Sequence, residues 1–302
     1  MQKFIFFMKK LCIFILTLFI GANSLIAQVS TEEQTLLDNL KVAKNAKNVS
    51  DIDYKKACYE ALAPLCNHYW STGQYIKGIE IVKEMMPIVE TLIGRYDQSY
   101  AGLEFYLAYM HMQIGKYDEA LAAFTSMRHT YQNSKIENPI AYANSICHFG
   151  SLHLMRGEYS EAQKYCFESL DIADKYSVNE VFKCTPYGAL AAIYSGTGQY
   201  KEAEKYMLKS LQLFPKEEAG YGNNLNNMGL LYFRMGRYDK AMDYFEQAHE
   251  VKKRFLPEKH PEHGSTISNI GLTNHCAGKY EEAEKYLLQA IEFQKELQEN
   301  HP

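Results

Sequence analysis

A ten-residue phrase built around glycine and tyrosine recurs six times along this chain of 302 residues. The copies are GQYIKGIEIV (73–82), GKYDEALAAF (115–124), GEYSEAQKYC (157–166), GQYKEAEKYM (198–207), GRYDKAMDYF (236–245) and GKYEEAEKYL (278–287). Successive glycines lie 42, 42, 41, 38 and 42 residues apart. A nearly fixed period of this length predicts an array of similar structural units that stack on one another.

Residues at fixed distances from each glycine also share their size. The residue seven positions before it is small: Cys66, Ala108, Gly150, Ala191, Gly229 and Gly271. The residue five positions after it is small again, and the residue nine positions after it is mostly bulky: Val82, Phe124, Cys166, Met207, Phe245 and Leu287. Small residues at two fixed points let two helices approach closely, and the large ones fill the space beside them.

The phrase itself predicts the turn between the two helices. Its glycine suits the left-handed position that ends a helix. Asp118, Ser160 and Asp239 are then predicted to cap the second helix, with acidic residues such as Glu119 near its positive end. Apolar residues beyond the turn have helical spacing, and no convincing alternating strand pattern occurs. The fold class is therefore all-α, made of helix-turn-helix units.

This pattern resembles the tetratricopeptide repeat, and it covers roughly residues 52–302. Its long period resembles the variant found in kinesin light chains, most clearly in residues 225–248 and in the linker PEKHPEHGS (257–265). The resemblance implies a right-handed superhelical solenoid of about six repeats, at approximately 52–93, 94–135, 136–177, 178–215, 216–257 and 258–302. Repeat four departs at Pro215, and repeat one is the weakest because it holds Pro64 and Gly78. Residues 28–51 are expected to form an N-terminal capping helix, at 31–46, and a linker.

The first 27 residues differ in composition from the rest. Lys9 and Lys10 precede the apolar run LCIFILTLFI, and small residues follow up to Ala27. This order predicts a signal peptide cleaved near Ala27, hence an exported protein that is periplasmic or secreted. The apolar run is short for a membrane span, so no stable insertion is expected after cleavage. Met1 and Met8 both remain possible starts.

Charge and cysteine usage limit the partners further. The chain has a formal charge of −4, and removal of residues 1–27 with their three lysines leaves −7. An acidic body without a basic, aromatic-rich run does not favour nucleic acid. Six cysteines remain after residue 27, in no framework or CxxC spacing, and buried small residues are the expected role although export permits disulfides.

No motif for catalysis, metal or cofactor binding is present, so we expect no enzyme, no cofactor and no metal site. His260, His263 and His275 form the nearest metal-like set, but His260 belongs to the KHP linker that the repeat variant shares. His111 and His153 replace the ring four residues before their glycines, where packing is the expected role.

A protein or peptide partner has better support, through the resemblance. Tetratricopeptide repeats imply a concave groove lined by the first helix of each repeat, where partners bind. The outward positions of these helices hold Trp70, Phe105, Tyr106, Tyr109, Met112, His148, Leu154 and Met155 in the first half, and Asn223, Asn226, Asn227, Leu230, Phe233, Ser268, Asn269 and His275 in the second. Rings anchor a partner, and asparagine pairs with peptide amides. The alternative interpretation is that these rings pack against neighbouring repeats.

The groove positions also exclude one ligand class. Repeats that bind acidic chaperone tails use lysine and arginine there, whereas only Arg234 occurs among these positions. A free carboxylate is therefore not the expected ligand.

The last predicted helix leaves Leu288 and Ile291 without a polar capping helix. Three interpretations stay open. The chain is a non-catalytic exported scaffold, or it is the recognition region of a longer membrane sensor or caspase-like peptidase, or it self-associates through its C-terminal helix.

Overall fold

The computed structural model describes residues 31–47, 49–258 and 260–299. The predicted signal peptide at 1–27 lies outside the described residues. Within them the chain forms thirteen α-helices and one short 3₁₀ helix, with no strand. The helices are α2 (Thr31–Lys44), α3 (Asp51–Ser71), α4 (Tyr75–Ile93), α5 (Gln98–Gln113), α6 (Tyr117–Gln132), α7 (Pro139–Met155), α8 (Tyr159–Lys175), η1 (Glu180–Lys183), α9 (Cys184–Gly196), α10 (Tyr200–Leu213), α11 (Ala219–Arg234), α12 (Tyr238–Phe255), α13 (Pro261–Cys276) and α14 (Tyr280–Glu299).

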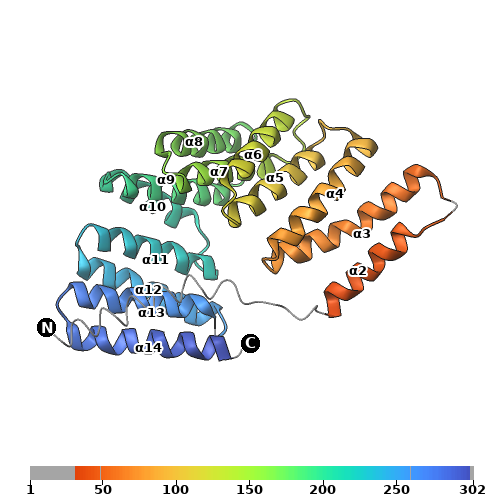
Figure 1. Ribbon diagram of the computed structural model, residues 1–302. Coiled ribbons are helices and arrows are strands. Elements are labelled where there is room, and N and C mark those ends of the chain that lie inside the picture. The colour runs from red at the N-terminus through yellow and green to blue at the C-terminus, as the bar shows by residue number, and fades with distance from the viewer. Residues whose placement is uncertain (1–30, 48, 259, 300–302) are drawn as a thin grey trace.

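The helices pair in chain order, from α3 with α4 to α13 with α14, and each pair stacks on the next. Figure 1 shows the result as an open arch. Its two ends are α2 in red and α14 in blue, and α5 to α10 form its crown. The predicted all-α solenoid of helix-turn-helix units is confirmed.

Each turn has the glycine conformation that the sequence predicts. Gly236 has a φ of 70°, and the equivalent glycines of the other turns lie between 71° and 79°. The N–H of Arg237 donates to the carbonyl of Tyr232 at 2.9 Å, and four further turns repeat this bond at 2.8–2.9 Å. This bond closes the Schellman motif, which satisfies a carbonyl left open at the end of the first helix.

The predicted helix caps are wrong. Each second helix begins two residues after the turn glycine. The N-caps are therefore Lys116, Glu158 and Arg237, and none of them makes a side-chain capping hydrogen bond. The tight turn sets this position, because the same residue that completes the Schellman bond also starts the next helix. Asp118 and Asp239 instead lie in the first turn, where a negative charge interacts favourably with the helix dipole.

The small residues before each glycine allow close helix contact. A Cβ on Gly229 would lie 2.6 Å from the Phe245 ring, and one on Gly271 would lie 2.8 Å from Leu287. Both partners are the bulky residues nine positions after the glycine. The predicted interlocking of small and large residues within a pair is therefore confirmed.

In repeats four and five the ring four residues before the glycine joins the repeat to the one before. The hydroxyl of Tyr232 donates to the Glu204 carboxylate on α10, and the Gln163 amide of α8 donates to the Tyr194 hydroxyl. His153 is buried, stacks on Tyr165 with ring centroids 5.1 Å apart, and contacts Glu158 through Nδ1 at 2.6 Å. His111 and His153 thus occupy packing positions.

Helix α2 takes the place of a second helix ahead of repeat one. Glu33 on α2 is buried and accepts from the Tyr69 hydroxyl at 3.0 Å, as Glu204 does from Tyr232. The Lys77 ammonium also donates to Glu33 at 2.8 Å and is the main cause of the lowered pKa of this carboxyl. Leu40 and Ala43 of α2 complete the core against α3. α2 therefore behaves as half a repeat rather than as an unrelated helix.

Glu104 on α5 is an unexpected buried carboxyl. It is 2% exposed and accepts from the hydroxyls of Ser126 and Thr130, the latter at 2.7 Å. Its burial raises the pKa, and the hydroxyl bonds only partly oppose the rise. The equivalent positions hold Leu62, Ile146, Leu225 and Ile267, so the signal in the sequence is an acid at an apolar repeat position.

We expect Gly236→Ala to lower the free energy of unfolding by about 1–2 kcal/mol, because alanine is strained at a φ of 70°. Gly188→Ala is the matched control. It lies inside α9 with nothing within 4 Å of an added Cβ, so it should stabilise the protein by about 0.5–1 kcal/mol. Urea unfolding followed by circular dichroism measures both. Equal effects of the two substitutions would contradict the assigned turn geometry.

We expect Glu104→Gln to be more stable than the parent at about pH 7, and the advantage to vanish on acidification. A carboxyl whose pKa is raised on folding stabilises the folded state when protonated, and this contribution is lost as pH rises through the folded pKa. Glutamine keeps a partner for Ser126 and Thr130 without the charge. Parallel unfolding curves of the two proteins across pH test this, and a parent that gains stability relative to the variant as pH rises would refute it.

Candidate functional site

The first helices of the pairs form one continuous surface, which we call the first-helix face: α3, α5, α7, α9, α11 and α13. Successive first helices from α5 onward contact one another directly, in addition to their contacts with second helices. Helices that meet along one side of a stacked array lie on the inner side of its curve. The predicted groove positions lie on these helices.

The aromatic residues predicted from repeats one to three come together. Trp70 of α3 lies with its ring centroid 4.3 Å from Tyr109 and 4.7 Å from Tyr106, both of α5. His148 of α7 contacts Tyr109 at 5.4 Å and Phe105 at 5.5 Å. We call these five residues the aromatic cluster. Three helices therefore present one ring surface.

The rings of the aromatic cluster are all partly exposed and uncharged at neutral pH. Burial raises the pKa of Tyr106 and Tyr109, and burial lowers the pKa of His148. The rings also pack on one another, so they are held rigidly before any partner arrives. A rigid, neutral ring surface provides apolar contact at a small loss of conformational entropy.

The remaining first-half positions differ from one another. Met112 is only 4% exposed and belongs to the core around Phe124, so its side chain does not reach the first-helix face. Leu154 is partly buried, whereas Met155 is 53% exposed at the end of α7. The spacing rule places Met112 outward, but its side chain is buried in this core.

The asparagines of the second half join α11 to α13. The Asn223 amide donates to the Glu262 carboxylate at 3.1 Å, and the Asn269 amide donates to the Asn226 side-chain oxygen at 3.0 Å. Asn227 is exposed. Asn223, Asn226 and Asn269 therefore hold adjacent first helices together as well as lining the face.

Phe233, Leu230, Ser268 and His275 complete the predicted set, and all four are partly buried. The Phe233 ring contacts Tyr238 of the following turn with centroids 5.7 Å apart. His275 contacts Tyr280 at 5.5 Å. These rings pack near the turns of their own repeats.

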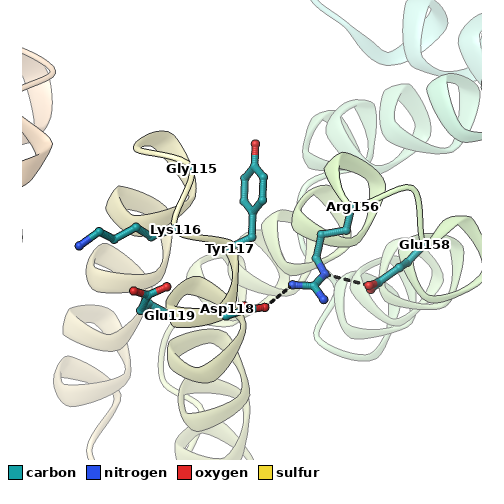
Figure 2. Close-up of a pocket in the computed structure, with 7 residues that line it drawn as sticks. All are labelled: Gly115, Lys116, Tyr117, Asp118, Glu119, Arg156 and Glu158. Atoms are coloured by element: carbon teal, nitrogen blue, oxygen red, sulfur yellow. Dashed lines mark hydrogen bonds and ion pairs between the residues drawn. The ribbon is translucent and has the colours of Figure 1, made fainter.

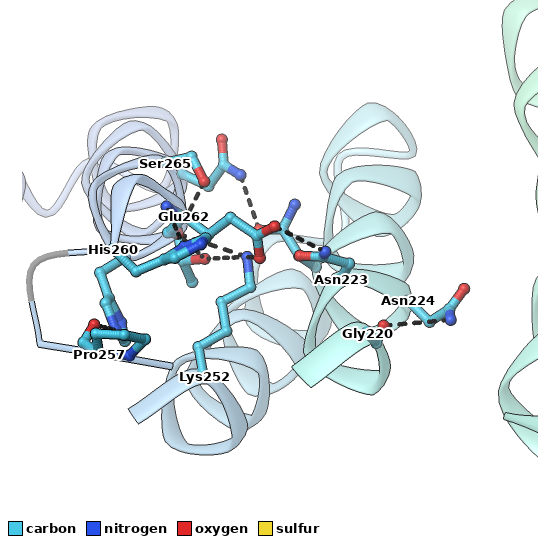
Figure 3. Close-up of polar contacts among 12 residues, drawn as sticks. Gly220, Asn223, Asn224, Lys252, Pro257, His260, Glu262 and Ser265 are labelled. Atoms are coloured by element: carbon cyan, nitrogen blue, oxygen red, sulfur yellow. Dashed lines mark hydrogen bonds and ion pairs between the residues drawn. The ribbon is translucent and has the colours of Figure 1, made fainter. Parts of the chain in front are cut away.

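Sequence reasoning missed the polar centre behind the asparagines (Figure 3). Lys252 of α12 is 1% exposed, with its ammonium 3.4 Å from the Glu262 carboxylate and 3.1 Å from the Thr266 hydroxyl. Desolvation lowers the pKa of this lysine. The equivalent positions of repeats one to four hold Val89, Tyr131, Ala173 and Phe214, so a lysine at a position that is apolar in those repeats was the available signal.

Comparison with known proteins shows which family the chain belongs to. A model of the tetratricopeptide repeat family matches residues 140–216 and 221–296, which is half of the chain. The chain belongs to the tetratricopeptide repeat family. Repeats of this family generally serve as non-catalytic scaffolds for protein–protein interaction.

Three similar proteins carry the same repeats or fold. Kinesin light chain-related protein 1 of Arabidopsis thaliana is 25% identical over 181 residues, which are 58% of this chain and 29% of that protein. The chain thus matches less than a third of that relative's length. BtubC (BKLC) from P. vanneervenii superposes with a TM-score of 0.59 at 18% identity, over 88% of this chain and 94% of BtubC.

A signal-transduction ATPase with numerous domains from Pyrococcus horikoshii has a tetratricopeptide repeat sensor. It superposes with a TM-score of 0.63 at 18% identity, over 87% of this chain and 41% of that protein. Likeness at this identity shows a shared fold. The kinesin light chain resemblance of the sequence and the solenoid architecture therefore agree.

Charge is distributed unevenly between the two helices of the tetratricopeptide repeats. The first helices from α5 to α13 carry only three Asp, Glu, Lys or Arg side chains, which are Glu104, Arg234 and Glu262. The second helix α8 alone carries six. Glu104 is buried and Glu262 faces Lys252, so Arg234 is the one exposed charge among these five helices.

Two surface hollows lie outside the aromatic cluster. The first, about 510 Å³, lies at the turns of repeats two and three, where the Arg156 guanidinium sits between Asp118 and Glu158 (Figure 2). Both nearby carboxylates already bind this arginine, and they raise its pKa. The second, about 380 Å³, lies between α2 and α3 and is lined mainly by apolar residues such as Leu36 and Ala61.

His260 and His263 have separate structural roles. His260 is the N-cap of α13 and its Nδ1 accepts from the Glu262 N–H at 3.4 Å, whereas His263 donates to the Pro257 carbonyl at 3.1 Å. Among the described residues no group of three His, Cys, Asp or Glu side chains is arranged to hold a metal ion. None of the helices in the described part of the chain has the length and apolar character needed to cross a membrane.

We expect Glu262→Gln to lower the free energy of unfolding by about 1–3 kcal/mol, because it leaves the buried Lys252 ammonium without a counter-charge. The double variant Lys252→Met, Glu262→Gln should recover most of this loss, since methionine needs no partner. Lys253→Met controls for loss of a lysine at the neighbouring exposed position and should change stability by less than about 0.5 kcal/mol. A double variant no more stable than Glu262→Gln would argue against this pairing.

Proposed function

We propose that the chain is a non-catalytic scaffold that binds a protein or peptide on its first-helix face. The observation that carries the proposal is the ring surface together with the low number of exposed charges on the first helices from α5 onward. Rings from three repeats lie together, and the five first helices from α5 onward expose one charge. Affinity then comes from apolar contact and amide hydrogen bonds rather than from ion pairs.

The two halves of the face supply different contacts in this proposal. The aromatic cluster takes an apolar side chain of the partner, because neutral rings have no preference for charge. The exposed Asn227 hydrogen bonds to the partner's peptide groups in this proposal. Asn226 and Asn269 do the same with the donor and acceptor atoms that their mutual hydrogen bond does not use. An extended, uncharged peptide segment suits both.

The double variant Tyr109→Ala, Asn227→Ala should weaken binding about tenfold or more while the helical circular dichroism is retained. Peptides selected on the full chain from a displayed random library serve as probes, with affinity measured by fluorescence anisotropy. Tyr96→Ala, Gln132→Ala removes the same side-chain types from exposed positions between helix pairs and should leave affinity unchanged.

Salt provides the second readout of the same experiment. Affinity should change little from about 0.1 M to about 1 M salt, because screening acts on charges and the first helices from α5 to α13 expose only Arg234. Equal affinity of the double variant and the parent would contradict binding on the first-helix face. A steep loss of affinity with salt would contradict binding by apolar contacts and amide hydrogen bonds.

We propose in addition that the protein is exported, with residues 1–27 removed as a signal peptide. The basic start, the ten-residue apolar run and the small residues up to Ala27 support this. N-terminal sequencing of the protein from an envelope fraction tests it. A chain recovered there should begin at Gln28, and an intact cytoplasmic chain would contradict export.

A second candidate role is recognition within a larger protein. The likeness to the repeat sensor of the ATPase from Pyrococcus horikoshii supports it, since the superposed part is 41% of that protein. Self-association through α14 is a third candidate, and the 55% exposure of Leu288 favours it. A coding region that continues in frame past Pro302 would support the former, and a monomer in light scattering would contradict the latter.

A further inference from the structure

Two cysteines of repeat three occupy facing positions of their helix pair. Cys147 lies ten residues before its glycine on α7, and Cys166 lies nine residues after it on α8. In repeat two the same positions hold Phe105 and Phe124, whose ring centroids are 6.3 Å apart. The repeat geometry therefore directs these two side chains toward each other.

The local packing places both thiols inside the α7–α8 pair. Cys147 is 1% exposed and Cys166 is not exposed at all. Gly150 follows Cys147 by one helical turn, and a Cβ added to it would lie 3.4 Å from the Cys166 sulfur and 3.0 Å from the Ala162 carbonyl oxygen. Glycine at this place lets α7 and α8 approach closely, as a disulfide between two helices requires.

We propose that Cys147 and Cys166 form a disulfide that joins α7 to α8 when the chain folds in the presence of a disulfide oxidant. One cysteine thiolate attacks the oxidant's disulfide, which yields a mixed disulfide and releases one thiol. The second cysteine thiolate attacks the protein sulfur of this mixed disulfide and releases the second thiol. The protein dithiol loses two electrons and two protons, and the oxidant is reduced to two thiols.

The other cysteines of the described residues have different surroundings. Cys58 and Cys66 lie two turns apart on α3, too far along one helix for a bridge. The Cys184 thiol donates to the Ser210 carbonyl at 3.4 Å, and Cys276 is exposed at the end of α13. Cys147 and Cys166 are thus the pair that the fold prepares for a bridge.

Burial decides when the bridge forms. The buried Cys147 thiol has a raised pKa, so little thiolate exists in the folded, reduced protein. Thiol–disulfide exchange with the oxidant should therefore be slow in the folded, reduced protein. It should be fast during folding, before α8 covers α7. The bridge needs no ligand, so its formation is independent of the proposed binding function.

The test refolds the full chain carrying Cys12→Ser and Cys276→Ser, with oxidised or with reduced glutathione, and then alkylates it under denaturing, non-reducing conditions. Proteolysis and mass spectrometry should find the Cys147 peptide linked to the Cys166 peptide, with two hydrogens lost, only after oxidative refolding. Cys184 should be alkylated in both samples. The oxidised protein should unfold roughly 5 °C higher than the reduced one.

Cys147→Ala and Cys166→Ala should each abolish the linked peptide and this rise in unfolding temperature. If a variant folds poorly, the linkage found in the peptides of the parent chain still tests the proposed disulfide. Complete alkylation of Cys147 and Cys166 after oxidative refolding, or their linkage to other cysteines, would overturn the proposal.

Discussion

The close contact of two helices across a small residue is the constraint on which the rest of this structure depends. Gly229 and Gly271 leave no room for a Cβ beside Phe245 and Leu287, so the α11–α12 and α13–α14 pairs are fixed in distance and register. The turn glycine then fixes the direction of the second helix. Its left-handed conformation lets the next residue close the end of the first helix and also serve as the N-cap of the second. Repetition of this unit produces the arch.

Fold and core followed from the sequence because they are governed by residue size at repeated positions. The small and bulky residues around each glycine need no knowledge of distant contacts. Two predictions from spacing were wrong. Met112 obeys the spacing of an outward position but is buried in the core, and Asp118 lies two residues after the N-cap of its helix.

The buried charges could have been found only by comparing repeats with one another. Glu104 and Lys252 stand where most other repeats carry apolar or aromatic residues, so each is visible as an exception. Their partners could not be found in this way. Ser126, Thr130 and Glu262 are ordinary polar residues in the sequence, and only the packing of adjacent helices brings them to the buried group. The candidate site also has a part that the sequence predicts and a part that it does not. Ring positions on the face were predictable, while the engagement of Asn223 and Asn226 with α13 was not.

Helix α2 has a consequence for how the solenoid comes apart. Linear repeat arrays open from their ends, since a terminal repeat has only one neighbour. Here the first repeat cannot open without withdrawing Tyr69 and Lys77 from a carboxylate that is itself buried. That step breaks two hydrogen bonds to a carboxylate, one of them from a charged donor, which adds to the cost of opening this end. Opening should then begin at the other end of the arch, and a protease acting on the native protein would trim it from the C-terminal side first.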